Sequence, residues 1–143
     1  MDTKFSSAIH TLMLIAESKS PLTSEQIANS VGTNASYIRK VIGLLKKQGM
    51  IESHRGISGF VLKPKPKELT LLQIYQAVND RKRPRLFDLH QNPNVQCVVG
   101  RYIRPVLTDM FAEIENAFAH TLAGKTLADC IGGIRKGLEA DAQ

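Results

Sequence analysis

The sequence TSEQIANSVGTNASYIRKVIGLLKK, residues 23–47, decides the fold. Thr23 and Gln26 have the spacing of a capping box, in which each side chain bonds the backbone N–H of the other, so a helix begins here. Gly32 is typical of a helix end, and Asn34 is a second start signal. The second helix places its apolar residues on one face, and these are Ile38, Val41, Ile42 and Leu45. Two helices joined by a turn of roughly three residues predict a helix-turn-helix.

The flanking segments extend this unit. Residues 4–17 place apolar side chains on one helical face, and Pro21 follows as a helix breaker. Residues 50–54 and 60–62 have the composition of two strands, and the glycine-containing segment 55–59 between them is typical of a hairpin turn. A hairpin directly after a helix-turn-helix predicts a winged helix.

A long helix dominates the C-terminal part of the chain. After a helix that Thr70 starts, the apolar pattern predicts a helix from about residue 95 to residue 122, which spans ~40 Å at the usual rise per residue. Gly124 ends it, and Thr126 starts a last helix. A domain of this size cannot cover so long an apolar stripe, so we expect a two-fold dimer. The expected interface residues are Ile103, Leu107, Met110, Ile114 and Phe118.

Together these elements predict a mainly α fold, a winged helix-turn-helix DNA-binding domain plus a long C-terminal dimerisation helix. We expect the DNA-binding domain at residues 1–80 and a connecting loop at 81–97. The dimerisation helix and the C-terminal helix then occupy residues 98–143. Such an arrangement is suited to reading two half-sites on one face of DNA.

Composition excludes several classes of protein. The chain has 143 residues, of which 43% are hydrophobic and 22% charged, which is ordinary for a globular domain. Two cysteines cannot make a disulfide scaffold or a four-cysteine zinc site, and no apolar run approaches the ~18 residues of a membrane span. We expect a cytoplasmic protein with no secretory signal and no membrane partner. Motifs such as a nucleophile elbow, a phosphate loop or His-Glu-x-x-His are missing, so we expect no enzyme, no catalytic residue and no metal site.

The positive charge lies in one segment. The net charge of the chain is +6, and residues 34–67 hold eight Lys or Arg against one acid, Glu52. Such a segment is typical of a surface that binds a polyanion, and from charge alone it is as typical of a solvated basic face. The helix-turn-helix spacing favours double-stranded DNA as the partner.

The helix after Asn34 has a polar, basic face opposite its apolar face. Gly43 on this face lets another surface approach closely, although an ordinary solvent face also tolerates a glycine. Because the first turn of such a helix usually reaches base edges, we expect this helix to contact DNA. Its expected contacts are Ser36, Tyr37, Arg39, Lys40 and Lys47.

The hairpin and the residues after it supply further expected contacts. An Arg near a wing tip suits the narrow minor groove, and the expected wing contacts are His54, Arg55 and Ser58. Lysines then alternate with prolines from Lys63 to Lys67, so we expect an extended segment that follows phosphates.

Cys97, near the expected start of the long helix, has two open interpretations. The helix N-terminus and Arg101 favour a thiolate, which makes Cys97 a candidate sensor. Val95, Val98 and Val99 indicate burial instead, which raises the pKa of a thiol and makes Cys97 a packing residue.

With these elements placed, the chain resembles the Rrf2 (Rrf-two) family of bacterial winged-helix transcription regulators, which includes IscR, NsrR and CymR. The resemblance rests on ASYIRK at residues 35–40, LLKKQGMI at 44–51, the Arg55-Gly56 pair with Gly59, and LTLLQIYQAV at 69–78. The tract from Asn92 to Gly100 is similar to the YwnA-type branch.

The resemblance implies a homodimer that binds operator DNA, usually as a repressor. It places the helix after Asn34 in the major groove and Arg55 in the minor groove, although Ser58 and Phe60 stand where family wings often have glycine. Cluster-binding members carry three closely spaced cysteines before the long helix. Here that region has Cys97 alone, so we expect no iron–sulfur cluster and no other cofactor. Some cluster-free members are thiol sensors, which keeps the sensor interpretation of Cys97 open.

Two alternative functions also stay open. In the first, the chain is a partner- or metabolite-dependent regulator, whose DNA binding is controlled through residues 80–96 rather than by cysteine chemistry. In the second, it coats DNA without regard to sequence, and its affinities for specific and nonspecific duplexes are nearly equal.

Overall fold

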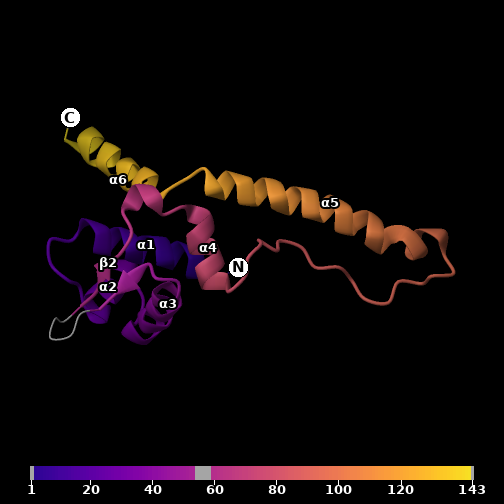
Figure 1. Ribbon diagram of the computed structural model, residues 1–143, viewed down its shortest axis with the longest axis horizontal. Coiled ribbons are helices and arrows are strands. Elements are labelled where there is room, and N and C mark those ends of the chain that lie inside the picture. The colour runs from indigo at the N-terminus through magenta and orange to yellow at the C-terminus, as the bar shows by residue number, and fades with distance from the viewer. Residues whose placement is uncertain (1, 54–58, 143) are drawn as a thin grey trace.

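The structure, a computed structural model, describes residues 2–53 and 59–142. The elements of this part of the chain are α1 (Lys4–Glu17), α2 (Ser24–Val31), α3 (Ala35–Lys47), β1 (Ile51–Glu52), β2 (Val61–Leu62), the 3₁₀ helix η1 (Pro66–Glu68), α4 (Leu71–Asn79), α5 (Val98–Ala123) and α6 (Leu127–Asp141). The elements from α1 to α4 form a body, and α5 extends from it as a long arm (Figure 1). The expected mainly α winged helix with a long C-terminal helix is confirmed.

Local signals start α2 and α3 where the sequence predicts. The Gln26 N–H donates to Thr23 Oγ1 at 3.3 Å, and the Thr23 N–H donates to Gln26 Oε1 at 2.9 Å, so the capping box is formed. Gly32 ends α2 with a φ of 86°, a left-handed conformation that glycine adopts without steric cost. The Tyr37 N–H donates to Asn34 Oδ1 at 2.8 Å and starts α3.

The body encloses one apolar core to which each of its helices contributes. The apolar faces of α1 to α4 meet there, and the side chains with no exposed surface include Leu12, Ile27, Ile38, Leu45 and Ile74. Burial of one such side chain stabilises the fold by about 1.5–3 kcal/mol. Because α3 is anchored through one face, its opposite face points away from the body.

The two strands of the wing pair in antiparallel fashion. Ile51 pairs with Leu62 and Glu52 pairs with Val61. Both strands are shorter than the expected 50–54 and 60–62. Phe60 leaves this ladder, since its N–H donates to the carbonyl oxygen of Leu22 at 3.2 Å and forms a bridge to the α1–α2 connection.

Gly59 is required where the wing meets the α1–α2 connection. Its φ is 119°, and a Cβ at this position would lie 2.7 Å from Pro21 Cβ and 2.8 Å from the carbonyl oxygen of Leu22. Atoms this close repel strongly, so a residue with a side chain would push the wing away from the body. The sequence predicts a glycine turn here, but not the packing that requires it.

The long helix α5 begins at Val98, later than the expected start near residue 95. Asn94 builds a turn first, since its Oδ1 accepts from the Gln96 N–H at 2.9 Å and its carbonyl oxygen accepts from the Cys97 N–H at 3.2 Å. A Cβ on Gly100 would collide with that carbonyl oxygen, so the turn needs glycine there. Neither α5 nor any other helix in the described ranges combines the length and apolar character needed to cross a membrane.

The last helix packs against the body. The Leu71 N–H donates to the Lys125 carbonyl, and the Leu127 N–H donates to the Leu69 carbonyl, both at 2.9 Å, so the segment before α6 lies beside the start of α4. Leu127 and Ile131 are buried there. The expected boundaries near residues 80 and 98 stay a prediction. The structure adds that α6, which lies in the expected C-terminal unit (residues 98–143), packs on the expected DNA-binding domain (residues 1–80).

Candidate nucleic-acid interface

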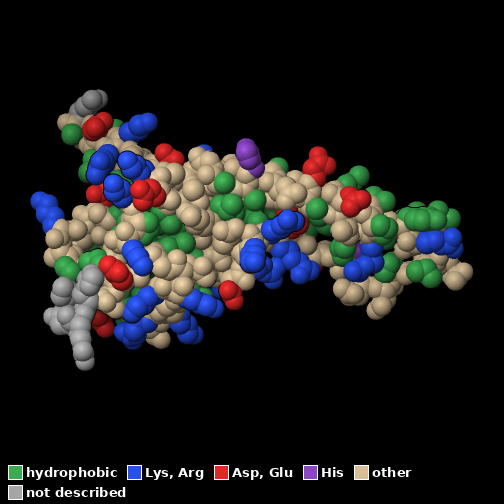
Figure 2. All heavy atoms as spheres, viewed as in Figure 1, with side chains coloured by type: hydrophobic (Ala, Val, Ile, Leu, Met, Phe, Trp, Pro, Cys, Tyr) green, Lys and Arg blue, Asp and Glu red, His purple; other side chains and the backbone are tan. Residues whose placement is uncertain are grey.

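The helix α3 has one face in the core and one face free. The core face is buried, and no member is more than 3% exposed: Ile38, Val41, Ile42 and Leu45. The residues of the opposite face are all exposed, and they are Ser36, Lys40, Gly43 and Lys47. We call these four residues the free face of α3. Figure 2 shows Lys and Arg atoms gathered over this part of the molecule.

The free face has unpaired charge and an unexplained glycine. In the described ranges, neither Lys40 nor Lys47 pairs with a carboxylate. Nothing lies within 4 Å of a Cβ built on Gly43, so no contact inside the chain requires glycine there. A glycine inside a helix costs about 1 kcal/mol relative to alanine. A second surface that approaches the helix backbone closely would account for it.

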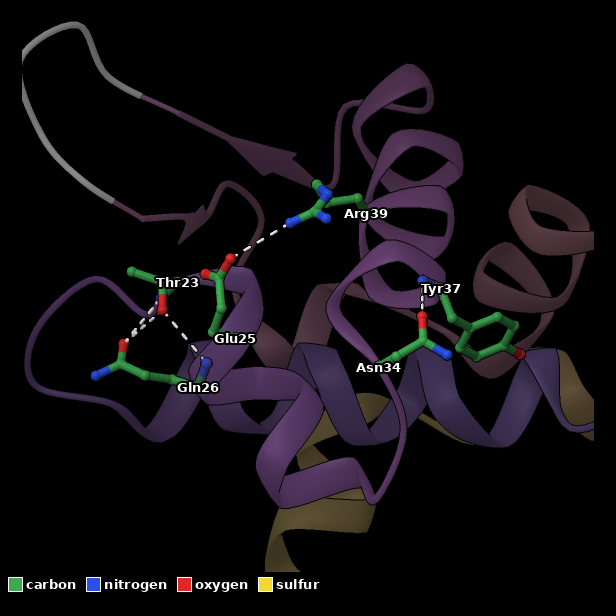
Figure 3. Close-up of polar contacts among 6 residues, drawn as sticks. All are labelled: Thr23, Glu25, Gln26, Asn34, Tyr37 and Arg39. Carbon is green, nitrogen blue, oxygen red and sulfur yellow. Dashed lines mark hydrogen bonds and ion pairs between the residues drawn. The ribbon is translucent and has the colours of Figure 1, made fainter.

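The first turn of α3 has a side-chain cap (Figure 3). Asn34 caps it through the Tyr37 N–H at 2.8 Å. The Tyr37 ring is half-buried against the core, so it is less available to a partner than the sequence suggests. Ser36 in the same turn is exposed.

Arg39 lies at the edge of the free face and reaches back to α2. Its Nη1 lies 3.4 Å from Glu25 Oε1, with the side chains 57% and 72% exposed (Figure 3). A pair this exposed contributes little to stability. It does set the direction of the guanidinium and places a carboxylate beside it, a contact that the sequence pattern does not reveal.

The expected wing contacts His54, Arg55 and Ser58 lie outside the described residues. The chain that leads into the wing is tied to α3, because Lys46 Nζ donates to Ser53 Oγ at 2.8 Å. Lys46 is therefore occupied inside the chain, in contrast to Lys40.

The expected extended lysine segment is wrong beyond Lys65. Pro66–Glu68 forms η1, whose start is closed by the Lys65 N–H donating to Glu68 Oε2 at 3.4 Å. Proline favours the first position of a helical turn, because its φ is already close to helical. Lys63, Lys65 and Lys67 are all exposed, but they do not follow one extended strand.

The long helix α5 has an uncovered apolar stripe. Four residues at every fourth position lie on one side of the helix, and each is between 48% and 55% exposed: Tyr102, Val106, Met110 and Ile114. We call these four the α5 stripe. The expected interface residues do not include Tyr102 and Val106, although their spacing from Met110 could have indicated both.

The other expected interface residues lie beside the α5 stripe or inside the chain. Ile103 and Leu107 are half-buried. The Phe118 ring meets the Tyr75 ring edge-on at a centroid distance of 5.7 Å, so it packs against α4 of its own chain. Their place in a dimer stays a prediction.

Cys97 is the N-cap of α5, and its side chain is exposed. Val98 and Val99 are 69% and 68% exposed, so the expected burial by valines is wrong. Backbone hydrogen bonds from Gly100 and then Val99 lower the pKa of the Cys97 thiol below its ordinary value. Cys130 differs, since burial raises the pKa of its thiol. The sensor interpretation requires an exposed sulfur, and this condition holds.

The chain is similar over most of its length to transcription regulators. The Rrf2 family model, described as iron-dependent transcriptional regulator, matches residues 1–133. YwnA of Bacillus subtilis (strain 168), a proposed HTH-type transcriptional regulator, is 39% identical over 129 residues, which are 90% of this chain and 95% of YwnA.

Solved structures share the fold. The crystal structure of a proposed DNA-binding protein is 35% identical, with a TM-score of 0.74 and coverage of 90% of this chain and 98% of that one. IscR of T. potens is 20% identical, with a TM-score of 0.71 and coverage of 96% of this chain and 89% of IscR. At this identity the comparison shows a shared fold and no more.

The family description names iron, but the donor groups of this chain do not fit an iron–sulfur cluster. Cys97 and Cys130 lie beyond opposite ends of α5, whose 26 residues span ~39 Å. Over residues 2–53 and 59–142, no three His, Cys, Asp or Glu side chains gather in a way that could hold a metal ion. One exposed thiol cannot replace the several thiolates that such a cluster needs.

Proposed function

Because the chain belongs to the Rrf2 family of DNA-binding transcriptional regulators, we propose that it is a homodimeric repressor of operator DNA. In this proposal, each protomer places the free face of α3 in the major groove of one half-site of a palindromic operator. The wing reaches the neighbouring minor groove, and two copies of α5 join the protomers.

The free face of α3 carries the proposal. Its opposite face is buried in the core, so the helix has one fixed orientation toward a partner. Lys40 and Lys47 are seven positions apart, which is two turns along one side, and both are exposed. The major groove of B-DNA is wide enough to admit an α-helix, and Gly43 between the two lysines permits close approach of the DNA.

The test is equilibrium binding to an operator selected from random duplexes by the wild-type protein. Lys40→Ala should weaken binding by about tenfold or more, because it removes a charge-assisted contact from each half-site. The slope of log affinity against log salt should fall by roughly 1 for each lost phosphate contact. Lys136→Ala on the exposed side of α6 is the matched control and should bind as wild type.

Two results would contradict the DNA part of the proposal. Equal binding by Lys40→Ala and wild type would mean that α3 does not face the duplex. Equal affinity for the selected operator and a scrambled duplex would indicate a DNA-coating protein instead. Repression itself is measured as reduced transcription from a promoter that contains the operator.

The α5 stripe supports the dimer. Apolar side chains in a continuous exposed row mark an interaction surface, and a two-fold axis lets the same row of a second copy cover it. In Figure 1, α5 extends away from α3, so pairing along α5 would leave both DNA-binding surfaces open.

Met110→Glu tests the dimer, because it places a charge in the middle of the stripe. We expect a folded monomer by sedimentation at micromolar concentration, with weakened operator binding. Ala112→Glu, an exposed position on another side of α5, is the control and should remain dimeric. A monomeric wild-type protein would overturn this part of the proposal.

We also propose that the regulator works without an iron–sulfur cluster. The isolation of Cys97 from Cys130 supports this. Protein purified without oxygen should contain no stoichiometric iron or sulfide, and operator binding should be unchanged by an iron chelator. Stoichiometric iron and sulfide would contradict it.

A further inference from the structure

A basic cleft lies between the segment after α4 and the long helix α5. It encloses about 510 Å³, a size typical of small-molecule sites. The segment is held against α5 by hydrogen bonds: the Leu86 N–H donates to Glu115 Oε2, and Arg104 Nη1 donates to the His90 carbonyl at 2.6 Å. A cluster of Lys and Arg atoms is visible beside α5 at the middle of Figure 2.

The walls of the cleft have an excess of positive charge. Five cationic side chains line it, against one carboxylate, Glu115. Arg85 pairs with Asp88 at 2.9 Å. In the part of the chain that the structure describes, Arg81, Lys82 and Arg83 form no ion pair. One wall of the cleft therefore consists of three adjacent exposed cations that no carboxylate in the described ranges neutralises.

The cleft also has an aromatic wall. The rings of Phe87 and Phe111 lie 4.8 Å apart between centroids, with their planes inclined by 39°. Phe87 is 41% exposed, so an apolar ring faces solvent in the same cleft that Arg81 and Arg83 line. A cation excess attracts an anion, and an exposed ring favours a flat apolar body.

We propose that this cleft binds a small aromatic carboxylate, which acts as the effector of the regulator. The carboxylate lies among Arg81, Lys82 and Arg83, and the ring packs against Phe87 and Phe111. The effector role rests on the proposed function, because it requires operator binding that the ligand can alter.

The position of the cleft explains how a ligand would act on DNA binding. Its cationic wall follows directly after α4, where the Arg81 N–H donates to the Gln76 carbonyl at 3.2 Å and Gln76 Nε2 donates to the Lys82 carbonyl at 2.6 Å. Its other wall is α5. A bound ligand thus connects the DNA-binding body to the proposed dimer helix and changes their relative orientation, which sets the half-site spacing.

The first experiment measures binding of sodium benzoate to the full-length protein without DNA, by calorimetry at constant ionic strength. We expect saturable binding at one site per protomer, with the largest amide shift changes in NMR at residues 81–91 and 104–115. Benzyl alcohol and inorganic phosphate, which supply only the ring or only the anion, should bind at least about tenfold more weakly. Benzoate and phosphate binding with equal affinity would overturn the proposal.

Variants locate the site. The double variant Arg81→Gln/Arg83→Gln should weaken benzoate binding about tenfold or more, and Phe111→Leu should weaken it about threefold or more. Lys125→Gln/Lys136→Gln removes the same charge elsewhere and should bind benzoate as wild type. Equal benzoate affinity in all of these proteins would place the binding outside the cleft.

The second experiment measures operator affinity with and without benzoate. We expect a change of about fivefold or more in wild type and none in Arg81→Gln/Arg83→Gln. Normal operator binding that ignores benzoate overturns the effector role and leaves the proposed function intact. If benzoate binds in the cleft but the protein binds no DNA, the proposed function is overturned and the ligand site is retained. Weakened operator binding by the double variant, with no benzoate binding by wild type, would show that these cations contact DNA and would overturn the inference.

Discussion

Gly43→Ala separates the stability of α3 from its contact with DNA. Glycine inside a helix is about 1 kcal/mol less favourable than alanine. Nothing lies within 4 Å of a Cβ built at Gly43, so the added methyl group meets no atom of the chain. We therefore expect the free energy of unfolding to rise by about 1 kcal/mol, which raises the melting temperature by roughly 3 °C for a chain of this length.

The same methyl group should weaken DNA binding. If the free face of α3 lies against base edges, the methyl group enters a closely packed interface, where overpacking costs about 1–3 kcal/mol. This corresponds to an affinity loss of about fivefold or more. Because the variant is more stable than wild type, its lost affinity cannot come from unfolding.

The assay is fluorescence anisotropy with labelled operator, alongside thermal unfolding at the same protein concentration. Gly133→Ala is the matched control, since Gly133 is also an exposed position inside a helix, with nothing within 4 Å of a Cβ built there. It should raise stability by a similar amount and leave operator affinity unchanged. A stabilised Gly43→Ala protein with wild-type affinity would refute the close approach of α3 to DNA. A destabilised one would refute the open space around Gly43.

Three further predictions follow from contacts described above. Gly59→Ala should destabilise the protein by about 1–3 kcal/mol in denaturant titration, because its φ of 119° and the neighbouring backbone exclude a Cβ; unchanged stability would contradict the wing packing. Glu25→Gln should change stability by less than about 0.5 kcal/mol yet raise operator affinity at low salt, because it removes a negative charge beside Arg39; unaltered affinity would place Arg39 away from the phosphates. At pH 7, iodoacetamide should modify Cys97 faster than Cys130, as measured by peptide mass spectrometry. The lowered thiol pKa of Cys97 leaves more thiolate at neutral pH, and the raised thiol pKa of Cys130 leaves less. Equal modification rates would contradict these two pKa shifts.

The sequence by itself determined the helices of the body and the character of α3. Thr23 and Asn34 cap their helices through backbone N–H groups three residues away, so no distant segment has to be known. The apolar spacing of α3 likewise determines which face is buried, and hence that Lys40 and Lys47 face outward. Signals of this kind act within one or two helical turns, and sequence reading captures them.

Only the tertiary structure decided where distant segments meet. The bridge between Leu22 and Phe60, which makes Gly59 necessary, joins residues that no local pattern connects. The same holds for α6, which packs on the body through the backbone bonds beside α4.

Tertiary packing also decided which parts of α5 are covered and which stay exposed. Phe118 and Met110 both belong to the apolar pattern of α5. The Tyr75 ring of α4 packs against Phe118, whereas Met110 stays exposed. The basic cleft exists because Leu86 and Arg104 hold the segment after α4 against α5. Periodicity states which residues share a side of a helix. Whether that side is covered depends on the path of the rest of the chain, and this path is a property of the whole fold.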